Sequence, residues 1–164
     1  MLVRVLVVVL VLLGLGLAVR FYMDRGAEDR LMPDEHVDIR ELRDPLPDNT
    51  FLACPPDYCA ATAALSPIFA LPAERLSQLW VQLMAGEPRV VVVADEPQPR
   101  RVVVIQHTPM LRFPDIVTVE FVALAADQSS LAIYSRARYG GGDFGTNRRR
   151  VLDWLSQLDQ LAGQ

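Results

Sequence analysis

The sequence predicts an α+β fold: a small antiparallel four-stranded sheet with two helices packed on one face, preceded by an N-terminal transmembrane helix. Three observations support this prediction. An uncharged apolar run opens the chain, four strand-like runs follow one another closely in its second half, and an amphipathic helix pattern stands on either side of those runs. With 164 residues and 51% hydrophobic content, the chain has room for one such domain and an appendage.

Residues 1–23 are predicted to be a transmembrane anchor or a signal segment. Val5 to Val19 is an uncharged run of fifteen residues, which as a helix spans about 22 Å against a hydrocarbon core of about 30 Å. Arg4 and Arg20 can extend their charged ends toward the headgroups, which lets the flanking apolar residues lengthen the span. We favour an uncleaved single-pass anchor in the inner membrane, with a cleaved signal peptide and a core helix as alternatives.

Residues 24–50 are charged, punctuated by prolines and without an apolar period, so they are predicted to be a spacer. The only two cysteines, Cys54 and Cys59, follow it in the segment CPPDYC. Their spacing suits a small disulfide loop in an oxidising compartment, with two free thiols as the alternative. The disulfide favours a periplasmic domain, whereas the arginines after the apolar run favour the cytoplasm. We expect the domain to be periplasmic.

The globular domain is predicted over residues 51–161, and it begins with a helix over 71–85 whose apolar residues share one face. Four runs rich in β-branched and apolar residues then predict strands: 89–94, 101–107, 117–124 and 130–135. Short turns join the first two and the last two, which requires antiparallel neighbours. A second amphipathic helix is predicted over 147–161. Helices at both ends of a run of strands predict a sheet with one covered face.

No motif in the sequence requires an enzyme. His36 and His107 have no nucleophile or acid at a useful spacing, and Ser135 has no GxSxG turn around it. The segment GGGDFG lacks the GK[ST] of a phosphate-binding loop. We therefore expect no catalytic residue, cofactor or metal site, and we favour a protein that is not an enzyme. The net charge of −4 and the pI of about 5.1 also argue against nucleic acid as a partner.

Positive charge is concentrated in SRARYGGGDFGTNRRR, at residues 135–150. The three consecutive glycines require a loop, and Thr146 or Asn147 is expected to cap the helix that follows. The arginines at 148–150 then lie in its first turn, where the helix dipole disfavours each cation by about 0.3–1 kcal/mol. Either a bound anion or an internal carboxylate could compensate. The internal candidates are Asp115, Glu120, Asp143 and Asp153.

The same segment carries a family resemblance. LRFPD at 111–115, AIYSRARYGGGDFGTNRRR at 132–150 and the CPPDYC loop resemble the domain of unknown function 1499 family, which occurs largely in bacterial membrane-associated or exported proteins. The resemblance extends from about Asn49 to Leu161. It implies an envelope location and supports the fold, but it implies no reaction. The family pattern matches Ser135, Arg136, Arg138, Gly140, Asp143, Gly145, Asn147, Arg148 and Arg150, whereas Tyr58, Ala137, Gly142 and Thr146 depart from it.

The functional hypothesis is a membrane-anchored envelope protein whose domain binds rather than catalyses. Its expected partners are the membrane, through the N-terminal helix, and an anionic lipid, another cell-envelope ligand or a partner protein. One alternative is a hydrolase or transferase that uses Asp143 or Asp115 as base and arginines as charge stabilisers. Another is a purely structural interaction domain. The candidate binding residues are Arg136, Arg138, Asp143, Asn147 and Arg148, with Arg112 and Asp115 adjacent.

Overall fold

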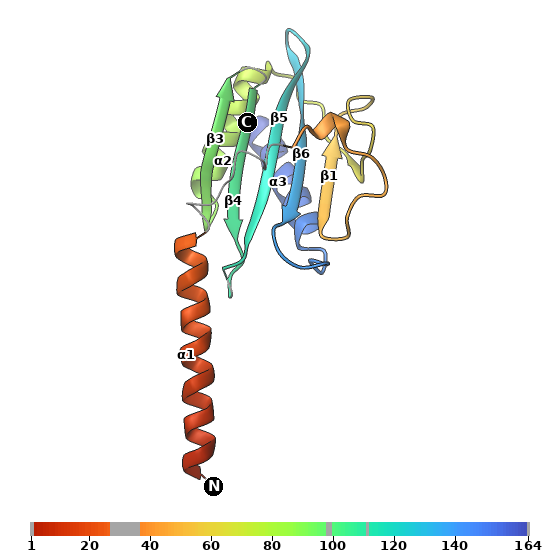
Figure 1. Cartoon of the computed structure of the whole chain (residues 1–164). Coiled ribbons are helices and arrows are strands. Elements are labelled where there is room, and N and C mark those ends of the chain that lie inside the picture. Colours follow the sequence, from red (N-terminus) through yellow and green to blue (C-terminus); the bar gives the residue numbers. More distant parts are fainter. Residues whose placement is uncertain (1, 27–36, 98–99, 111, 164) are drawn as a thin grey trace.

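The computed structural model in Figure 1 describes residues 2–26, 37–97, 100–110 and 112–163. Part of the predicted spacer, residues 27–36, lies outside the described residues. The first helix, α1 (Leu2–Gly26), contains a segment, Arg4–Phe21, with a mean hydropathy of 2.4 and no buried residue. By length and composition, α1 can serve as a membrane anchor or as a signal sequence.

A six-stranded mixed sheet forms the centre of the domain, in the order β2-β1-β6-β5-β4-β3. The pair β1 and β2 is parallel, and the other neighbouring pairs are antiparallel. The strands are β1 (Thr50–Cys54), β2 (Ala64–Leu65), β3 (Val90–Pro97), β4 (Arg100–His107), β5 (Pro114–Ala125) and β6 (Gln128–Ala137).

The predicted four-stranded antiparallel sheet with two helices is therefore wrong, because the described residues form six strands in a mixed sheet and three α-helices. The four predicted strands correspond to β3, β4, β5 and β6. The strand β1 has no period of two, since both of its faces are covered: Phe51 and Ala53 join one apolar cluster, and Leu52 and Cys54 join another. The strand β2 has only two residues, which is too few to show a pattern.

Two helices, α2 (Ala73–Gly86) and α3 (Thr146–Ala162), cover one face of the sheet and lie behind it in Figure 1. Both helices bury the faces that their apolar periods predict. They meet at Trp80 and Trp154, whose ring centroids are 5.6 Å apart in an edge-to-face arrangement. This contact fixes α3 against the sheet, and with it the position of the first turn of α3.

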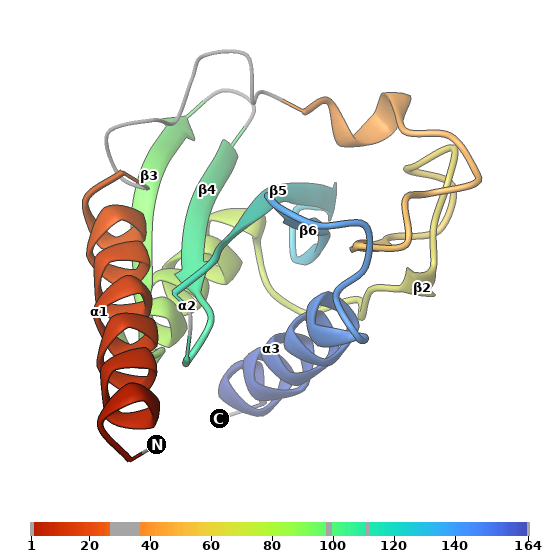
Figure 2. The ribbon, with the colours of Figure 1, turned by 60° about the horizontal axis from the view of Figure 1, so that its bottom comes forward.

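The opposite face of β1 and β6 is covered by a segment that the sequence places in the spacer. A short 3-10 helix, η2 (Ile39–Glu41), buries Ile39 completely against the sheet. The segment is drawn in orange in Figure 2, along the edge of the sheet that carries β2. Beside it, Cys54 and Cys59 form a disulfide bond. The folded domain therefore includes residues on the amino-terminal side of Phe51.

Candidate functional site

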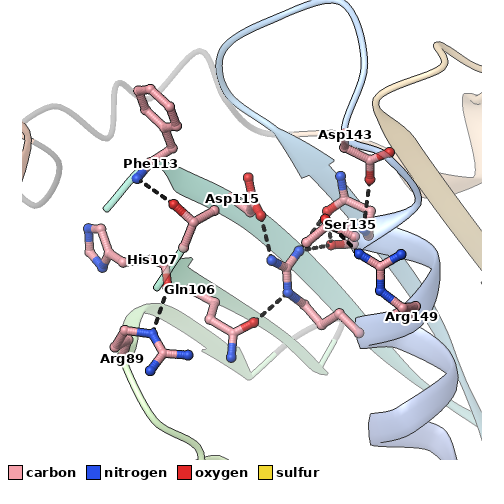
Figure 3. A network of polar contacts seen from close by, with 12 residues as sticks. Arg89, Gln106, His107, Phe113, Asp115, Ser135, Asp143 and Arg149 are labelled. Atoms are coloured by element: carbon pink, nitrogen blue, oxygen red, sulfur yellow. Dashed lines mark hydrogen bonds and ion pairs between the residues drawn. The ribbon is translucent and has the colours of Figure 1, made fainter. Parts of the chain in front are cut away.

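Three polar side chains on neighbouring strands point toward α3 at one end of the sheet (Figure 3). Gln106 of β4 pairs in register with Asp115 of β5, and Ser135 of β6 pairs with Val117, two residues further along β5. Because side chains alternate between the two faces of a strand, all three lie on the face that packs against the helices. The sheet thus brings an amide, a carboxylate and a hydroxyl beneath the first turns of α3.

Arg150 of α3 donates hydrogen bonds to all three. Its Nε donates to Gln106 Oε1 (2.5 Å), its Nη1 donates to Ser135 Oγ (2.9 Å), and its Nη2 forms an ion pair with the Asp115 carboxylate. Both partners of the ion pair are buried. Burial raises the pKa of the Asp115 carboxyl above its ordinary value of 3.8, and the Arg150 guanidinium opposes that rise. One arginine of the helix start therefore has an internal carboxylate as partner.

Asn147 joins this network to the amino-terminal end of the domain. Its Oδ1 accepts hydrogen bonds from Arg150 Nη1 (2.6 Å) and from Ser135 Oγ (2.6 Å), and its Nδ2 donates to the carbonyl oxygen of Asn49 (2.8 Å). The side chain of Asn49 in turn donates to the carbonyl oxygen of Gly140 (2.8 Å). Asn147 is fully buried, so its role within the described residues is to hold the loop, the strand and the helix together.

Asp143 stabilises the start of α3. Its Oδ1 accepts a hydrogen bond from the Gly145 backbone N–H (2.9 Å), and its Oδ2 accepts one from the Asn147 backbone N–H (2.6 Å). Gly145, with φ 74°, is the N-cap residue, so the helix begins one residue earlier than a cap at Thr146 would allow. A carboxylate at this position interacts favourably with the helix dipole. It thereby offsets part of the free-energy cost of placing arginines in the first turn.

The other two arginines of the helix start have different surroundings. Arg149 turns back on the preceding loop, where its Nη1 donates to the carbonyl oxygen of Phe144 (2.9 Å) and its Nη2 donates to Thr146 Oγ1 (3.2 Å). Arg148 is exposed, and its guanidinium lies over the Phe51 ring at 6.0 Å from the centroid. Of the three successive arginines, Arg148 therefore lies at the surface, Arg149 bonds the loop and Arg150 joins the buried network.

A groove of about 590 Å³ lies between the first turns of α3 and the ends of β3 and β4, and we name it the arginine groove. Arg89 enters it with φ 60°, and its Nε donates to the carbonyl oxygen of His107 (3.0 Å). Asp153 is the single carboxylate among the described residues that line this groove. Four arginines line it together: Arg89, Arg148, Arg149 and Arg150.

A second cavity of about 360 Å³ adjoins the arginine groove, and the two share Thr108 and Thr146. Asp115 and Asp143 line this second cavity, which we name the aromatic pocket. Three aromatic rings also line this pocket: Phe113, Tyr139 and Phe144. The buried ion pair thus separates a basic groove from a pocket that contains carboxylates and aromatic rings.

The predicted site residues divide into two groups. Asp115, Asp143 and Asn147 belong to the hydrogen-bonded network around Arg150, and Arg148 lines the arginine groove. The remaining three arginines line neither cavity. Arg136 is half-buried at the end of β6, Arg138 lies over the Tyr139 ring at 5.9 Å, and Arg112 lies in the connection between β4 and β5 with φ 57°.

Sequence reasoning missed Arg89, Gln106 and the central position of Arg150. The alternation of β4 places Gln106 on the helix side, but its partner Asp115 could be identified only with the register between β4 and β5. Among the described residues, no three His, Cys, Asp or Glu side chains come together as metal ligands. The guanidinium groups that line the arginine groove are of a chemistry that suits the binding of an anion.

A family model described as "Protein of unknown function (DUF1499)" matches residues 49–158, which is more than half of the chain. The resemblance predicted from the arginine segment is thereby confirmed. The matched range begins at Asn49 and contains every residue of the network around Arg150. A comparison with curated proteins finds no match.

Proposed function

Because the chain belongs to the DUF1499 family of proteins of unknown function, we propose its function from the site itself: the domain binds an anionic group, phosphate or carboxylate, in the arginine groove, without catalysis. In this proposal α1 stays attached as an anchor in the inner membrane, and the domain works in the periplasm. The protein is then a binding or accessory component of the envelope.

One observation carries the proposal, namely four arginines around one open groove with a single lining carboxylate. That carboxylate, Asp153, already accepts a hydrogen bond from Gln157 Nε2 (3.0 Å). The guanidinium of Arg148 makes no hydrogen bond with a described residue, and the one hydrogen bond from Arg89 uses Nε. Guanidinium groups with donors to spare match the oxygens of phosphate and carboxylate in paired geometry.

The structural role of Arg150 supports the rigidity of this groove. Its guanidinium is fixed by Gln106, Ser135, Asn147 and Asp115. A binding surface whose wall is held by buried hydrogen bonds loses little conformational entropy when a ligand arrives. The volume of about 590 Å³ also falls within the range of small-ligand sites, which is about 300–1,000 Å³.

The proposed location depends on the cysteine pair. The bond between Cys54 and Cys59 favours an oxidising compartment, as disulfides are rare in the cytosol. A reporter that is active only in the periplasm, fused after Gln164, tests this point. We expect activity, and an inactive reporter beside an active cytoplasmic reporter at the same position would reverse the assignment.

A hydrolase or transferase that uses Asp115 or Asp143 has one observation in its favour, since burial raises the pKa of the Asp115 carboxyl and Asp115 lines the aromatic pocket. The surroundings of both groups oppose it. The Asp115 carboxylate is bonded to Arg150, and both oxygens of Asp143 accept backbone N–H groups. Carboxylates held in this way support the fold, and binding remains the function we propose.

Thermal unfolding of the full chain in non-ionic detergent, with inorganic phosphate and pyrophosphate against chloride at equal ionic strength, tests the binding proposal. A ligand at a hundred times its Kd stabilises by about 2.7 kcal/mol. We expect both anions to raise the Tm of the wild type, and we expect Arg148→Ala to weaken that rise without lowering the Tm in chloride. Arg75→Ala, a change on the exposed side of α2, is the matched control. If neither anion shifts the wild type, the groove is a structural surface only.

A further inference from the structure

Four apolar side chains gather at one end of the sheet. Met110 and Phe113 lie in the connection between β4 and β5, and Tyr139 and Phe144 lie in the loop between β6 and α3. Both loops lie at the lower end of the domain in Figure 1. The ring centroids of Phe113 and Tyr139 are 6.4 Å apart, and Phe144 lines the same pocket as these two rings. We name these four residues the loop tip.

The fold holds the loop tip in solvent. Phe144 is 98% exposed and Met110 is 83% exposed. Phe144 has φ 54°, a conformation that a bulky residue rarely adopts. Its carbonyl oxygen accepts a hydrogen bond from Arg149 Nη1 (2.9 Å), and Gly145, the next residue, donates its N–H to Asp143 (2.9 Å). Neighbouring apolar side chains that a bonded loop keeps in water are typical of a surface that contacts a partner.

Arginines surround the loop tip. Arg112 and Arg138 lie in the same two loops, and the arginines at 148–149 lie in the first turn of α3 beside them. The guanidinium of Arg148 makes no hydrogen bond with a described residue, and that of Arg149 donates to Phe144 and Thr146 rather than to a carboxylate. The whole chain has a net charge of −4, so this end differs from the rest of the protein in both charge and apolar exposure.

We propose that the loop tip docks on the surface of an anionic lipid bilayer. Phe144 and Met110 enter the headgroup region, and the surrounding arginines face the lipid phosphates. Aromatic side chains concentrate at the membrane–water interface, and basic residues are attracted to anionic leaflets. This docking goes beyond the binding of an anion in the arginine groove, and it does not require that groove to be occupied.

The chain itself favours a bilayer over another partner. The segment Arg4–Phe21 is long and apolar enough to cross a membrane. Ten residues, 27–36, separate α1 from Val37 in the sequence, and ten residues span at most about 35 Å. A domain on so short a tether stays beside the membrane, where even a weak docking surface meets lipid at a high effective concentration.

The test uses the full chain, inserted through α1 into lipid nanodiscs, with Phe144→Trp as the reporter. The native Trp80 and Trp154 are 0% and 1% exposed, so they give a constant background. We expect the added tryptophan to emit at shorter wavelength and to be quenched by brominated acyl chains in nanodiscs that contain phosphatidylglycerol. Quenching should be weaker in nanodiscs of phosphatidylcholine alone, and it should fall as salt is raised.

The matched control is Leu124→Trp. Leu124 is an exposed apolar residue at the carboxyl-terminal end of β5, whereas Asp115 and the loop tip lie at the other end of that strand. It should not be quenched. In the Phe144→Trp background, Arg148→Glu should reduce quenching, whereas Arg75→Glu should not. Equal quenching at both reporter positions overturns the proposal. So does a shift to shorter wavelength without quenching, because a protein surface, such as a second copy of the chain, would then cover the tip. The phosphate titration contains no bilayer, so the two proposals fail separately.

Discussion

Replacing Arg150 by methionine removes the buried guanidinium but keeps an unbranched side chain. The guanidinium makes four hydrogen bonds, one each to Gln106, Ser135, Asn147 and Asp115. Hydrogen bonds to charged groups contribute about 1.5–3 kcal/mol each, although the cost of burying both charges cancels much of their sum. Breaking a buried ion pair by removing one partner typically costs about 3–5 kcal/mol. For a domain of this size we expect the Tm to fall by about 10–20 °C.

Urea unfolding of the full chain in detergent, followed by tryptophan fluorescence, measures the loss. Trp154 lies one turn beyond Arg150 in α3 and is buried against the sheet, so its emission reports the docking of this helix. In the double variant Arg150→Met with Asp115→Asn, no unpaired charge is buried. We expect the double variant to be more stable than Arg150→Met alone by about 1–3 kcal/mol, a coupling typical of contacting residues.

The pH dependence of Arg150→Met gives an independent check. The Arg150 guanidinium lowers the pKa of the Asp115 carboxyl, while burial raises it. Without the guanidinium, the pKa of Asp115 rises further above 3.8. A carboxyl whose pKa is raised by folding adds stability below its unfolded pKa, and that stability is lost as pH rises through the folded pKa. Arg150→Met should therefore regain stability relative to the wild type as pH falls from 7 toward 4.

A loss of less than about 1 kcal/mol in Arg150→Met, the scale of an ordinary surface change, would contradict a structural role for the ion pair. So would a difference in stability from the wild type that is the same at every pH, or a double variant whose loss equals the sum of the two single losses. Any of these results would mean that the ion pair does not hold α3 to the sheet.

Two further variants test the loop that leads into α3. Asp143→Ala removes the acceptor for the N–H groups of Gly145 and Asn147 and should lower the free energy of unfolding by about 0.5–2 kcal/mol; an unchanged urea midpoint would contradict the capping role. Gly145→Ala should cost about 1 kcal/mol or more, since Gly145 has φ 74° and an added Cβ would lie 3.4 Å from Arg149 Nη1. Gly141→Ala is its control, because a Cβ there meets nothing within 4 Å, and comparable losses at both positions would show that the φ argument is wrong.

The sequence predicts the parts of the fold whose signal is periodic. The helix faces around Trp80 and Trp154 and the four strands from β3 to β6 follow from apolar spacing alone. Apolar spacing does not predict the strand β1. A strand buried on both faces shows no alternation, and five residues are too few to separate strand from loop. The burial of Ile39 is not predicted either, since its neighbours in the sequence are charged and its burial depends on contacts with the distant β1 and β6.

The candidate site is predicted only in part. The cost of cations at a helix start correctly directs attention to an internal carboxylate, and Asp115 is among the candidates. The dipole argument does not tell Arg150 from Arg148, because the rotation of α3 about its axis is set by packing at Trp154. The register that places Gln106 opposite Asp115 depends on a proline-containing connection with no fixed turn signature. Arg89 lines the groove with φ 60°, and the residues around it in the sequence do not predict a positive φ there.

The bond from Asn147 to the backbone of Asn49 has a consequence for how the protein matures. The strand β1 pairs with β6, which is far from it in the sequence. Asn147 bonds a residue 98 positions earlier in the chain. In a polypeptide that is synthesised from its amino terminus, Asn49 therefore lacks its Asn147 partner, and the arginine groove lacks one wall, until the last helix has emerged. Such distant pairings slow folding, and the groove is completed in a single late step, so a chain interrupted before α3 has no complete groove.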